Sequence, residues 1–324
     1  MIVRWGLDEL EPLLREVAVE RPLLVTSERF ADHTLPVERR FTGVRPHTPS
    51  ASVRLAVAAA AGADGLVPLG GGSAIDTAKA VSAETGLPVV SVPTTYSGAE
   101  WTTFYGQRDE EQRFKGGGGG ARTVGIVYEP QLTLDLPRDV TGGTALNALA
   151  HCAEALYTRT RSPDGDPDAL EGAALIASSL PSVLDDGHDL AARAALLRGS
   201  MHAGAALAAS FMGLAHALAQ ALGGRYGLAH GAMNALVLGP TLRFNEPVAA
   251  AAIARLASAL RGEDAADACD ALARRAGFRR LRDFDVPQDE LDEVARAAIV
   301  RPAARANPRE ATAAEAAGIL HEAW

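Results

Sequence analysis

The stretch that decides the fold is GLVPLGGGSAIDTAKA, residues 65–80. A short apolar run leads into three glycines, and a serine and an Ala-rich segment follow them. Glycines allow a sharp turn and a close approach of the main chain to a ligand. We expect a strand over 65–69 and then a helix whose N-cap is Ser73, with Asp76 in its first turn. The N–H groups and dipole of such a helix favour a bound phosphate, although a tight structural turn is an equal alternative.

A second loop of this kind occurs in VPTTYSGAEWT, residues 92–102. Its apolar run ends at Pro93, and four hydroxyl side chains follow, those of Thr94, Thr95, Tyr96 and Ser97. Hydroxyl groups at the carboxyl end of a strand can contact a ribose or a phosphate. A polar turn explains either loop alone, but two such loops after successive strands favour a nucleotide site.

Strand and helix patterns alternate over the first part of the chain and then change. Apolar strand-like runs begin at 21, 65, 88 and 124 with helical segments among them, which predicts a parallel sheet. From about Asp139 onward, Ala- and Leu-rich segments with helical spacing dominate. They cover 143–159, 168–182, 189–222, 231–240, 248–260, 264–276 and 311–323. We therefore predict an α/β domain over 1–140 and an all-helical domain over 141–324.

The composition restricts the class of protein. The chain has 324 residues, a net charge of −9 and two cysteines, Cys152 and Cys269. An acidic chain disfavours nucleic acid and membrane as partners, and so few cysteines fit a reducing compartment. We find no signal peptide and no apolar run long enough to span a membrane, so we expect a cytoplasmic protein. The run KGGGGGA, residues 115–121, predicts a mobile loop, either a hairpin tip or a lid.

Polar residues at helical spacing mark the second domain. In TALNALAHCAEALY, Asn147 and His151 lie four apart and share one helix face. In GLAHALAQALGGRYGLAHG, His216 and Gln220 repeat this spacing, and His230 follows. Three histidines and a carboxylate would form a metal site, but here the fourth member is an amide, which offers a cation only a dipole. Three imidazoles alone still bind zinc, whereas iron(II) is held less well without a carboxylate.

Several of these motifs together resemble a known family. PLGGGSAIDTAKA, LPVVSVPTTYSGAEWT, IVYEPQLTLDLP and LNALAHCAEALY are similar to the iron-containing alcohol dehydrogenase superfamily. VPTTYSGAE, NALAHCAEALY, LGGRYGLAHG and the tail ANPREATAAEAAGILHEAW resemble its maleylacetate reductase branch. The resemblance covers nearly the whole chain. It implies an α/β N-terminal dinucleotide-binding domain with a parallel sheet and an all-helical C-terminal domain, the dehydroquinate synthase-like fold.

The resemblance implies which residues bind the cofactor, NADH or NADPH. The pyrophosphate would lie on the glycine loop, and hydroxyls of the second loop would contact phosphate and the nicotinamide ribose. Ser27 lies where relatives receive the adenosine ribose. An Asp there usually favours NAD, so its absence leaves NAD versus NADP open. The residues implied are Gly70, Gly71, Gly72, Ser73, Thr94, Thr95, Ser97, Ser27 and Lys115, the last matching a lysine near the nicotinamide ribose.

The resemblance also implies roles in the second domain. Metal-dependent relatives use an Asp, a His four residues later and two further His, spaced as His216 and His230 are here (230 − 216 = 14). Asn147 replaces the Asp, as in the maleylacetate reductase branch, which implies a metal-free site. His151, His216 and His230 are then candidates to donate a proton or a hydrogen bond to a carbonyl. Zinc or iron on these three histidines is the alternative.

One position departs from the branch. The branch has a second histidine four residues after the first, where this chain has Gln220. A glutamine donates a hydrogen bond but transfers no proton, so activity on maleylacetate itself is put in question. The candidate catalytic residues are therefore Asn147, His151, His216, Gln220 and His230.

The predicted function is an NAD(P)H-dependent reductase of a small acidic keto or enone substrate. The lead case is maleylacetate to 3-oxoadipate, in the catabolism of aromatic compounds. We expect a homodimer, since family members often pair through their N-terminal domains. Three alternatives stay open: a metal-dependent alcohol dehydrogenase, a lyase on the same fold that recycles its cofactor, and a catalytically silent nucleotide-binding paralogue.

Overall fold

The computed structural model describes residues 1–109 and 114–324, with the main chain only at 114 and 115. Its internal contacts divide the chain into two compact units. The sheet unit comprises Met1–Thr95 and Ala99–Thr133, and the helical unit comprises Tyr96–Gly98 and Leu134–Trp324. The loop after Thr95 thus contributes three residues to the helical unit. The predicted domain limits, 1–140 and 141–324, stay a prediction.

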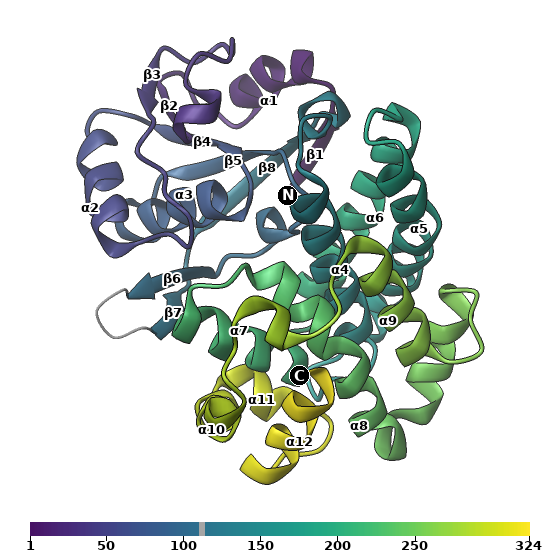
Figure 1. The fold of residues 1–324 in the computed structure, drawn as a ribbon. Coiled ribbons are helices and arrows are strands. Elements are labelled where there is room, and N and C mark those ends of the chain that lie inside the picture. The colour runs from purple at the N-terminus through teal and green to yellow at the C-terminus, as the bar shows by residue number, and fades with distance from the viewer. Residues whose placement is uncertain (110–113) are drawn as a thin grey trace. The chain divides into compact units, whose positions relative to one another are not determined.

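A six-stranded sheet forms the core of the sheet unit (Figure 1). Its strands pair in parallel in the order β1-β8-β5-β4-β2-β3, which confirms the predicted α/β fold. The strands are β1 (Ile2–Trp5), β2 (Pro22–Val25), β3 (Arg39–Phe41), β4 (Gly65–Gly70), β5 (Pro88–Pro93) and β8 (Arg122–Tyr128). The sequence did not indicate β1 or β3, because runs of four and three residues show no clear periodicity.

Helices cover both faces of this sheet because consecutive strand residues point to opposite sides. Leu66 packs in an apolar cluster with residues of α2 and α3, whereas its neighbour Val67 packs in a second cluster with residues of α1. The helices are α1 (Leu10–Glu16), α2 (Ser50–Ala59) and α3 (Gly72–Thr85). The two apolar layers fix the strands and therefore the loops at their carboxyl ends.

The glycine run is part of a hairpin. Gly116, Gly117 and Gly118 lie in β7 (Phe114–Gly118), which pairs antiparallel with β6 (Tyr105–Asp109). A Cβ atom on Gly117 would lie 1.9 Å from the carbonyl oxygen of Tyr105, so only glycine fits there. The prediction of a loop is wrong for these three residues, because pairing with β6 outweighs the low strand propensity of glycine.

A buried lysine anchors the chain that follows β5. Lys79 is 1% exposed and pairs with Asp76 one turn earlier in α3. Its Nζ also donates to the carbonyl oxygens of Ala99 and Phe104 at 2.8 and 2.5 Å, and to Thr102 Oγ1 at 3.0 Å. The glycine-loop helix and the segment after the second loop are therefore tied together by one buried charge.

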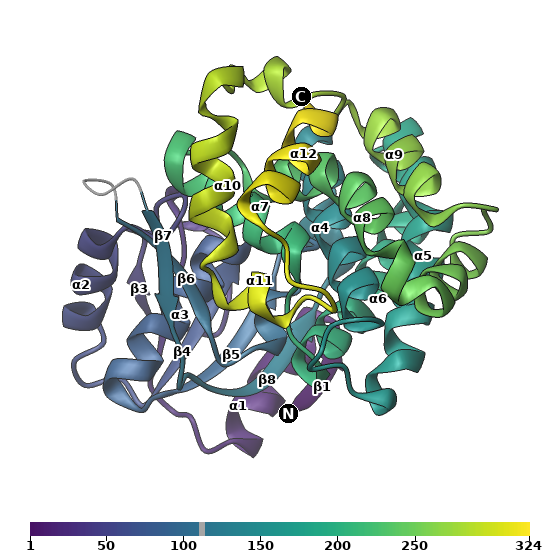
Figure 2. The same ribbon diagram turned by 90° about the horizontal axis from the view of Figure 1, so that it is seen from below.

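The helical unit is built from α4 to α12. Its helices are α4 (Arg138–Ala155), α5 (Asp166–Asp185), α6 (Leu190–Ala209), α7 (Leu214–Tyr226), α8 (His230–Ala259), α9 (Ala265–Ala276), α10 (Leu291–Ile299), α11 (Pro302–Ala306) and α12 (Ala313–Ala323). α7 packs against α8, α10 and α11, and α12 packs against α8 and α10 (Figure 2). The prediction that this part of the chain is helical is confirmed.

Three helix predictions differ from the structure. The segment predicted as one helix over 189–222 is two, α6 and α7, bent by 103°. The two segments predicted over 231–240 and 248–260 lie in α8, where the first helix continues through 241–247 and meets the second at a kink with non-helical angles at Ala249. α10 is missing from the predicted helices, although its buried residues recur at helical spacing: Leu291, Val294, Ala295 and Ala298.

Short 3-10 turns connect these elements. They lie at Leu7–Glu9, Glu28–Phe30, Ala99–Trp101, Pro130–Thr133, Pro163–Gly165, Leu281–Phe284 and Gln288–Glu290. Across the described residues, each helix taken singly is too short or too polar to cross a membrane. Only α6 and α7, taken together as a bent pair, are long and apolar enough by length and composition.

Candidate functional site

The two predicted cofactor loops lie next to each other at the carboxyl edge of the sheet. β4 ends at Gly70 and its neighbour β5 at Pro93, and the Thr94 N–H donates to the Gly70 carbonyl at 3.0 Å. A Cβ atom on Gly71 would lie 2.8 Å from Thr95 Cγ2, so this position must be glycine. Thr95 Oγ1 is buried and has no hydrogen-bond partner within the described chain. An open main-chain cradle beside a buried hydroxyl group fits a phosphate-bearing ligand.

Ser73 differs from its predicted role. Helix α3 begins at Gly72 with Gly71 as its N-cap, so the prediction that Ser73 caps this helix is wrong. The main chain turns at Gly70, with φ of 152°, and at Gly71, so the helix begins two residues earlier than a cap at Ser73 would place it. Ser73 lies in the first helical turn, where its Oγ accepts from the His47 N–H at 3.1 Å. The main-chain N–H groups of the glycine loop, and not a serine cap, therefore shape this helix N-terminus.

The remaining predicted cofactor residues are placed by different elements. Ser27 follows β2, the other neighbour of β4, and thus lies at the same sheet edge as the glycine loop. Ser97 belongs to the helical unit, where its carbonyl group accepts a hydrogen bond from α4. The side chain of Lys115 lies outside the described residues, although its main chain pairs with Arg108 in the hairpin.

Three helices bring the predicted histidines together. His151 comes from α4, His216 from α7 and His230 from the first residue of α8. The rings of His151 and His216 are stacked with their centroids 4.6 Å apart and their planes 13° apart. The His230 ring lies 5.6 Å from that of His216, tilted by 51°. The structure therefore places the predicted histidines in one cluster within the helical unit.

A main-chain carbonyl sets the direction of the hydrogen bonds in this cluster. The Ser97 carbonyl can only accept, and Asn147 Nδ2 donates to it at 3.1 Å. The other proton of Asn147 Nδ2 faces His151 Nε2 at 3.4 Å, a long hydrogen bond. Asn147 Oδ1 must then accept, and it does so from Asn234 Nδ2 at 2.7 Å. Asn234 Nδ2 in turn faces His230 Nε2 at 3.2 Å.

This direction specifies the neutral forms of two histidines. An Nε2 that faces an amide N–H group must carry its lone pair there, so the ring proton of His151 and of His230 is on Nδ1. Burial lowers the pKa of His151 well below its ordinary value of 6.5, and the charge of His216 lowers it further. His151 is therefore a neutral ring, and its Nδ1 has no hydrogen-bond partner among the residues described.

A buried carboxylate orients the third histidine. Glu154 on α4 is 0% exposed and accepts the main-chain N–H groups of Gly213 and Ala215, at the start of α7, at 2.6 and 2.8 Å. His216 Nδ1 lies 2.5 Å from Glu154 Oε2 and donates to it. The N-terminus of a helix favours such a negative charge. His216 Nε2 is left facing away, buried and without a hydrogen-bond partner in the described part of the chain.

Gln220 lies one turn after His216 on α7 and contacts a buried arginine. Its Oε1 accepts from Arg301 Nη1 at 3.4 Å, and its Nε2 faces the sulfur of Met212 at 3.8 Å. Arg301 is 7% exposed and precedes α11, which packs on α7. The amide of Gln220 is thus held between a cation and a thioether.

The side chains of the cluster do not converge as metal ligands. The lone pairs of His151 Nε2 and His230 Nε2 face amide donors, and Asn147 Oδ1 is taken by Asn234. In this stacked arrangement the rings of His151 and His216 do not direct their nitrogen atoms at one ion. Within residues 1–109 and 114–324 no group of three or more His, Cys, Asp or Glu side chains is placed to hold a metal ion.

Sequence patterns missed three residues of this cluster: Glu154, Asn234 and Arg301. Glu154 and Asn234 share helix faces with residues that were found, because each lies three or four positions from one of them. A search for polar residues at this spacing would have found both. Arg301 is 81 residues from Gln220, and no local pattern indicates their contact.

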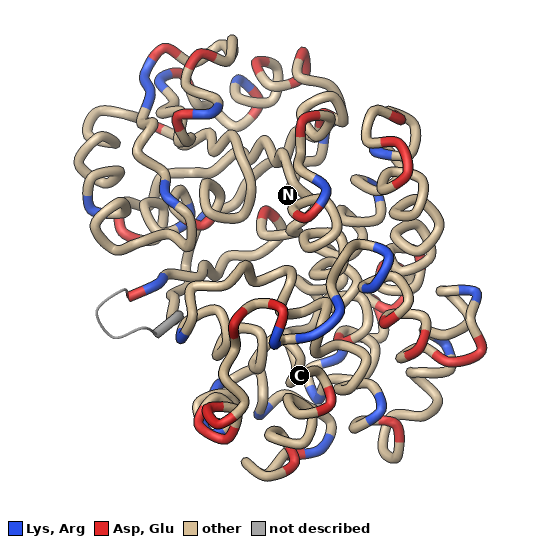
Figure 3. The backbone as a smooth tube through the Cα atoms, in the orientation of Figure 1, with Lys and Arg blue, Asp and Glu red and all other residues tan. Residues whose placement is uncertain are grey.

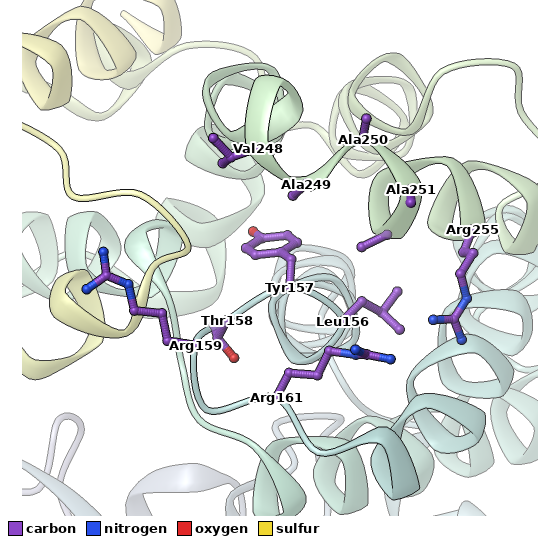
Figure 4. Close-up of a pocket in the computed structure, with 11 residues that line it drawn as sticks. Leu156, Tyr157, Thr158, Arg159, Arg161, Val248, Ala249, Ala250, Ala251 and Arg255 are labelled. Carbon is purple, nitrogen blue, oxygen red and sulfur yellow. The ribbon is translucent and has the colours of Figure 1, made fainter.

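Two cavities in the helical unit are lined by other residues. One, of about 560 Å³, is lined by Leu156–Arg159, Arg161, Val248–Ala252 and Arg255. In Figure 4 the ring of Tyr157 points into it below Val248 and Ala249, where α8 is kinked. Asp166 pairs with both Arg161 and Arg255, at 2.6 and 2.5 Å, so both cations already have an anionic partner.

The second cavity, of about 800 Å³, lies near the basic stretch that follows α9, visible in Figure 3. Its lining includes Arg279, Arg280 and Arg282, and also Asp270 and Glu322. Asp270 and Glu322 both pair with Arg243, which also lines the cavity. Neither cavity is lined by a candidate site residue, so we do not assign the predicted site to them.

Comparisons with known proteins agree with this architecture. Residues 4–123 match the profile of iron-containing alcohol dehydrogenase, and residues 141–324 match that of the Fe-containing alcohol dehydrogenase family, C-terminal part. The chain belongs to the iron-containing alcohol dehydrogenase family. It is an NAD(P)-dependent oxidoreductase, and the predicted family and enzyme class are confirmed.

Within this family the chain is similar to maleylacetate reductases. It is 34% identical to the maleylacetate reductase of Burkholderia cepacia over 95% of this chain and 92% of that protein. It is 35% identical to that of Rhizobium sp. strain MTP-10005 over 85% of this chain and 79% of that protein. The crystal structure of maleylacetate reductase from Agrobacterium tumefaciens superposes with a TM-score of 0.90 at 30% identity, covering 100% of this chain and 95% of that one.

The lowered pKa of His151 predicts a loss of stability in acid. Above pH 6.5 the His151 ring is neutral in the folded and in the unfolded state, so it does not lower the free energy of unfolding. Below pH 6.5 the unfolded chain gains a proton that the folded chain does not. The free energy of unfolding should then fall by about 1.4 kcal/mol per pH unit from this residue, until the pKa of the folded state is reached.

Denaturant unfolding of the wild type and His151→Asn at pH 7.5, 6.5 and 5.5 measures this contribution. In His151→Asn the free energy of unfolding should fall less steeply below pH 6.5 than in the wild type. His321→Asn, at an exposed residue of α12, should show the wild-type dependence on pH. Equal slopes for the wild type and His151→Asn would show that His151 is not held neutral.

Proposed function

We propose that this protein uses NADH or NADPH to reduce a small acidic keto or enone substrate. Maleylacetate, with 3-oxoadipate as its product, is the lead case. The observation that carries the proposal is the orientation of His216, whose Nδ1 is fixed by buried Glu154 while Nε2 has no partner among the described residues. Similarity to maleylacetate reductases over most of the chain supports the choice of substrate.

The cofactor would be held by the carboxyl edge of the sheet. The N–H groups at the start of α3 and the hydroxyl group of Thr95 are suited to its phosphates, and Ser27 is suited to its adenosine ribose. Bound there, the nicotinamide supplies the hydride. Ser27 carries no carboxylate that would reject a 2′-phosphate, so both cofactors remain to be tested.

His216 is our candidate for the proton donor. Adding a hydride to an enone or ketone leaves negative charge on oxygen, and one proton must follow to complete the reduction. A proton on His216 Nε2 would be balanced by Glu154 at Nδ1, at 2.5 Å. A carboxylate hydrogen-bonded at Nδ1 orients the ring and fixes which nitrogen is left facing away from it.

His151 would have a different role from His216. The lowered pKa of His151 leaves its ring neutral, without a second proton to transfer, but its Nδ1–H group can donate a hydrogen bond to a developing oxyanion. Two stacked rings cannot both carry a charge at low cost. The stacking therefore disfavours positive charge on both rings at once.

We propose that the reaction needs no metal ion. The direction of the amide hydrogen bonds supports this, because Asn147 and Asn234 occupy the lone pairs that an ion would need on His151 and His230. An asparagine at 147 also removes the one anionic ligand of the metal-dependent arrangement. Assembly as a homodimer in the cytoplasm stays a prediction.

Replacing His216 tests the proposed proton donor. His216→Asn should lower kcat with maleylacetate by about 100-fold or more while KM changes by a few fold, since the variant cannot deliver a proton. The measurement is the steady-state oxidation of NADH and of NADPH. His202→Asn, at a half-buried residue paired with Asp168, is the matched control and should keep wild-type rates.

Three outcomes would contradict the proposed function. Turnover of substrate with no net consumption of NADH or NADPH would indicate a lyase. Cofactor binding with no turnover of maleylacetate or other acidic ketones would indicate a silent paralogue. Equal rates for the wild type and His216→Asn would show that His216 is not the proton donor.

Restoring a carboxylate tests the metal-free part of the proposal. Asn147→Asp has no N–H group for Ser97 and His151, so it frees His151 Nε2 and adds an anionic ligand. Dialysis against zinc followed by metal analysis should then find about one equivalent in the variant and much less in the wild type. One equivalent of zinc or iron on the wild type, lost with His151→Asn, would contradict a metal-free site.

A further inference from the structure

The larger cavity of the helical unit, of about 800 Å³, is positively charged. Its walls come from α8, α9 and α12 and from the segment 278–283 that follows α9. Among the described residues, five arginines and three carboxylates line it, so its lining has a net charge of +2 in a chain whose net charge is −9. We call it the arginine cavity, after Arg243, Arg274, Arg279, Arg280 and Arg282.

A reversal of the chain after α9 brings four of these arginines together. They lie in ARRAGFRRLRD, residues 273–283. α9 ends at Ala276, and Gly277 adopts the left-handed conformation with φ of 103°. The Phe278 N–H then donates to the Ala273 carbonyl at 2.9 Å, and the Phe278 side chain is buried. The arginines that follow this turn are therefore anchored beside the last turn of α9, which carries Arg274.

The carboxylates of the cavity already have partners within the protein. Asp270 and Glu322 pair with Arg243 at 2.7 and 2.6 Å. Asp283 Oδ2 accepts the main-chain N–H group of Arg280 at 3.1 Å. Two of the three carboxylates are thus held by Arg243, which leaves one negative charge against the other four arginines.

Two of these arginines have no partner for their charge. Within residues 1–109 and 114–324, the guanidinium groups of Arg274 and Arg279 make no ion pair, hydrogen bond or ring contact. Arg275, the neighbour of Arg274 on α9, does not line the cavity and pairs with Asp185 at 2.6 Å. A guanidinium group without a partner keeps its full charge and five N–H donors for a ligand.

The other two arginines are held in place without losing their charge. Arg280 Nη1 donates to the main-chain carbonyl oxygen of Glu322 at 3.2 Å. The guanidinium carbon of Arg282 lies 5.5 Å from the centroid of the Trp324 ring, a favourable arrangement of a cation and an aromatic face. Cations that are already positioned lose less conformational entropy when a ligand binds.

We propose that the arginine cavity binds a small organic anion that carries two or more negatively charged oxygen groups, a phosphate ester or a polycarboxylate. Arg274 and Arg279 can each form charge-assisted hydrogen bonds with such groups, in the two-pronged geometry that suits phosphate and carboxylate oxygens. A concave site of about 800 Å³ has the size of a small-molecule pocket. The proposal does not rest on the proposed reaction, because no candidate catalytic residue lines the cavity.

The test measures anion binding by calorimetry. Inorganic pyrophosphate and citrate are titrated separately into the protein with NADP⁺ in excess, so that the phosphate cradle of the sheet unit is occupied. Arg274→Gln and Arg279→Gln each remove one cation that has no partner. Arg275→Gln is the matched control, because it removes the same charge from the adjacent position of α9, outside the cavity.

We expect the wild type to bind at least one of the two anions, and Arg274→Gln and Arg279→Gln to bind it about 10-fold or more weakly. Arg275→Gln should match the wild type. Both cavity variants should unfold at the wild-type temperature, since neither arginine makes an ion pair or hydrogen bond to lose. Binding of pyrophosphate alone would assign a phosphate-bearing ligand, and binding of citrate alone would assign a polycarboxylate.

Three results would overturn the proposal. The first is a wild type that binds neither anion. The second is equal affinity in the wild type, Arg274→Gln and Arg279→Gln, which would place the bound anion elsewhere. The third is equal weakening in Arg275→Gln, which would show that the net charge of the protein decides binding and the cavity does not. If one cavity variant does not fold, the other decides.

Discussion

The hydrogen bond from Asn147 to the Ser97 carbonyl is the constraint on which the histidine cluster depends. A carbonyl oxygen only accepts, so this one contact fixes which end of the Asn147 amide donates. Asn147 Oδ1 must therefore accept, so Asn234 donates to it. The two amides then present N–H groups to the Nε2 atoms of His151 and His230. An aspartate at 147 would reverse this pattern, because it could accept but not donate. The exchange of one amide nitrogen for an oxygen at position 147 therefore decides whether His151 Nε2 can ligate a metal or faces an N–H group.

Glu154 supplies the second constraint and links the cluster to the fold. Its carboxylate accepts N–H groups at the start of α7, where the chain turns by 103° after α6. A Cβ atom on Gly213 would lie 2.9 Å from this carboxylate, so the turn requires a glycine. Leaving a buried carboxylate without such partners would cost several kcal/mol. The same contacts that begin α7 therefore also orient His216.

The sequence predicts the part of this molecule that depends on local spacing. The parallel sheet, the glycine loop and the histidine positions follow from periodicities and from motifs a few residues long. The break before α7 does not, because it is made by Glu154, which lies 59 residues from Gly213 in the chain. The local pattern predicts Ser73 as the cap of α3, but the turn at Gly70 and Gly71 lets the helix begin two residues earlier. Long-range partners of buried polar groups, such as Arg301 for Gln220, are invisible to any local pattern.

The central claim is that the amide network holds His151 as a neutral ring with its proton on Nδ1. Long-range ¹H–¹⁵N NMR spectra of the histidine side chains report the tautomer directly, with the His151 signals assigned by their loss in His151→Asn. We predict the Nδ1–H tautomer at neutral pH for His151, and a proton on His216 Nδ1 shifted downfield by Glu154. An Nε2–H tautomer at His151, which would require the Asn147 amide to be reversed, would contradict the account.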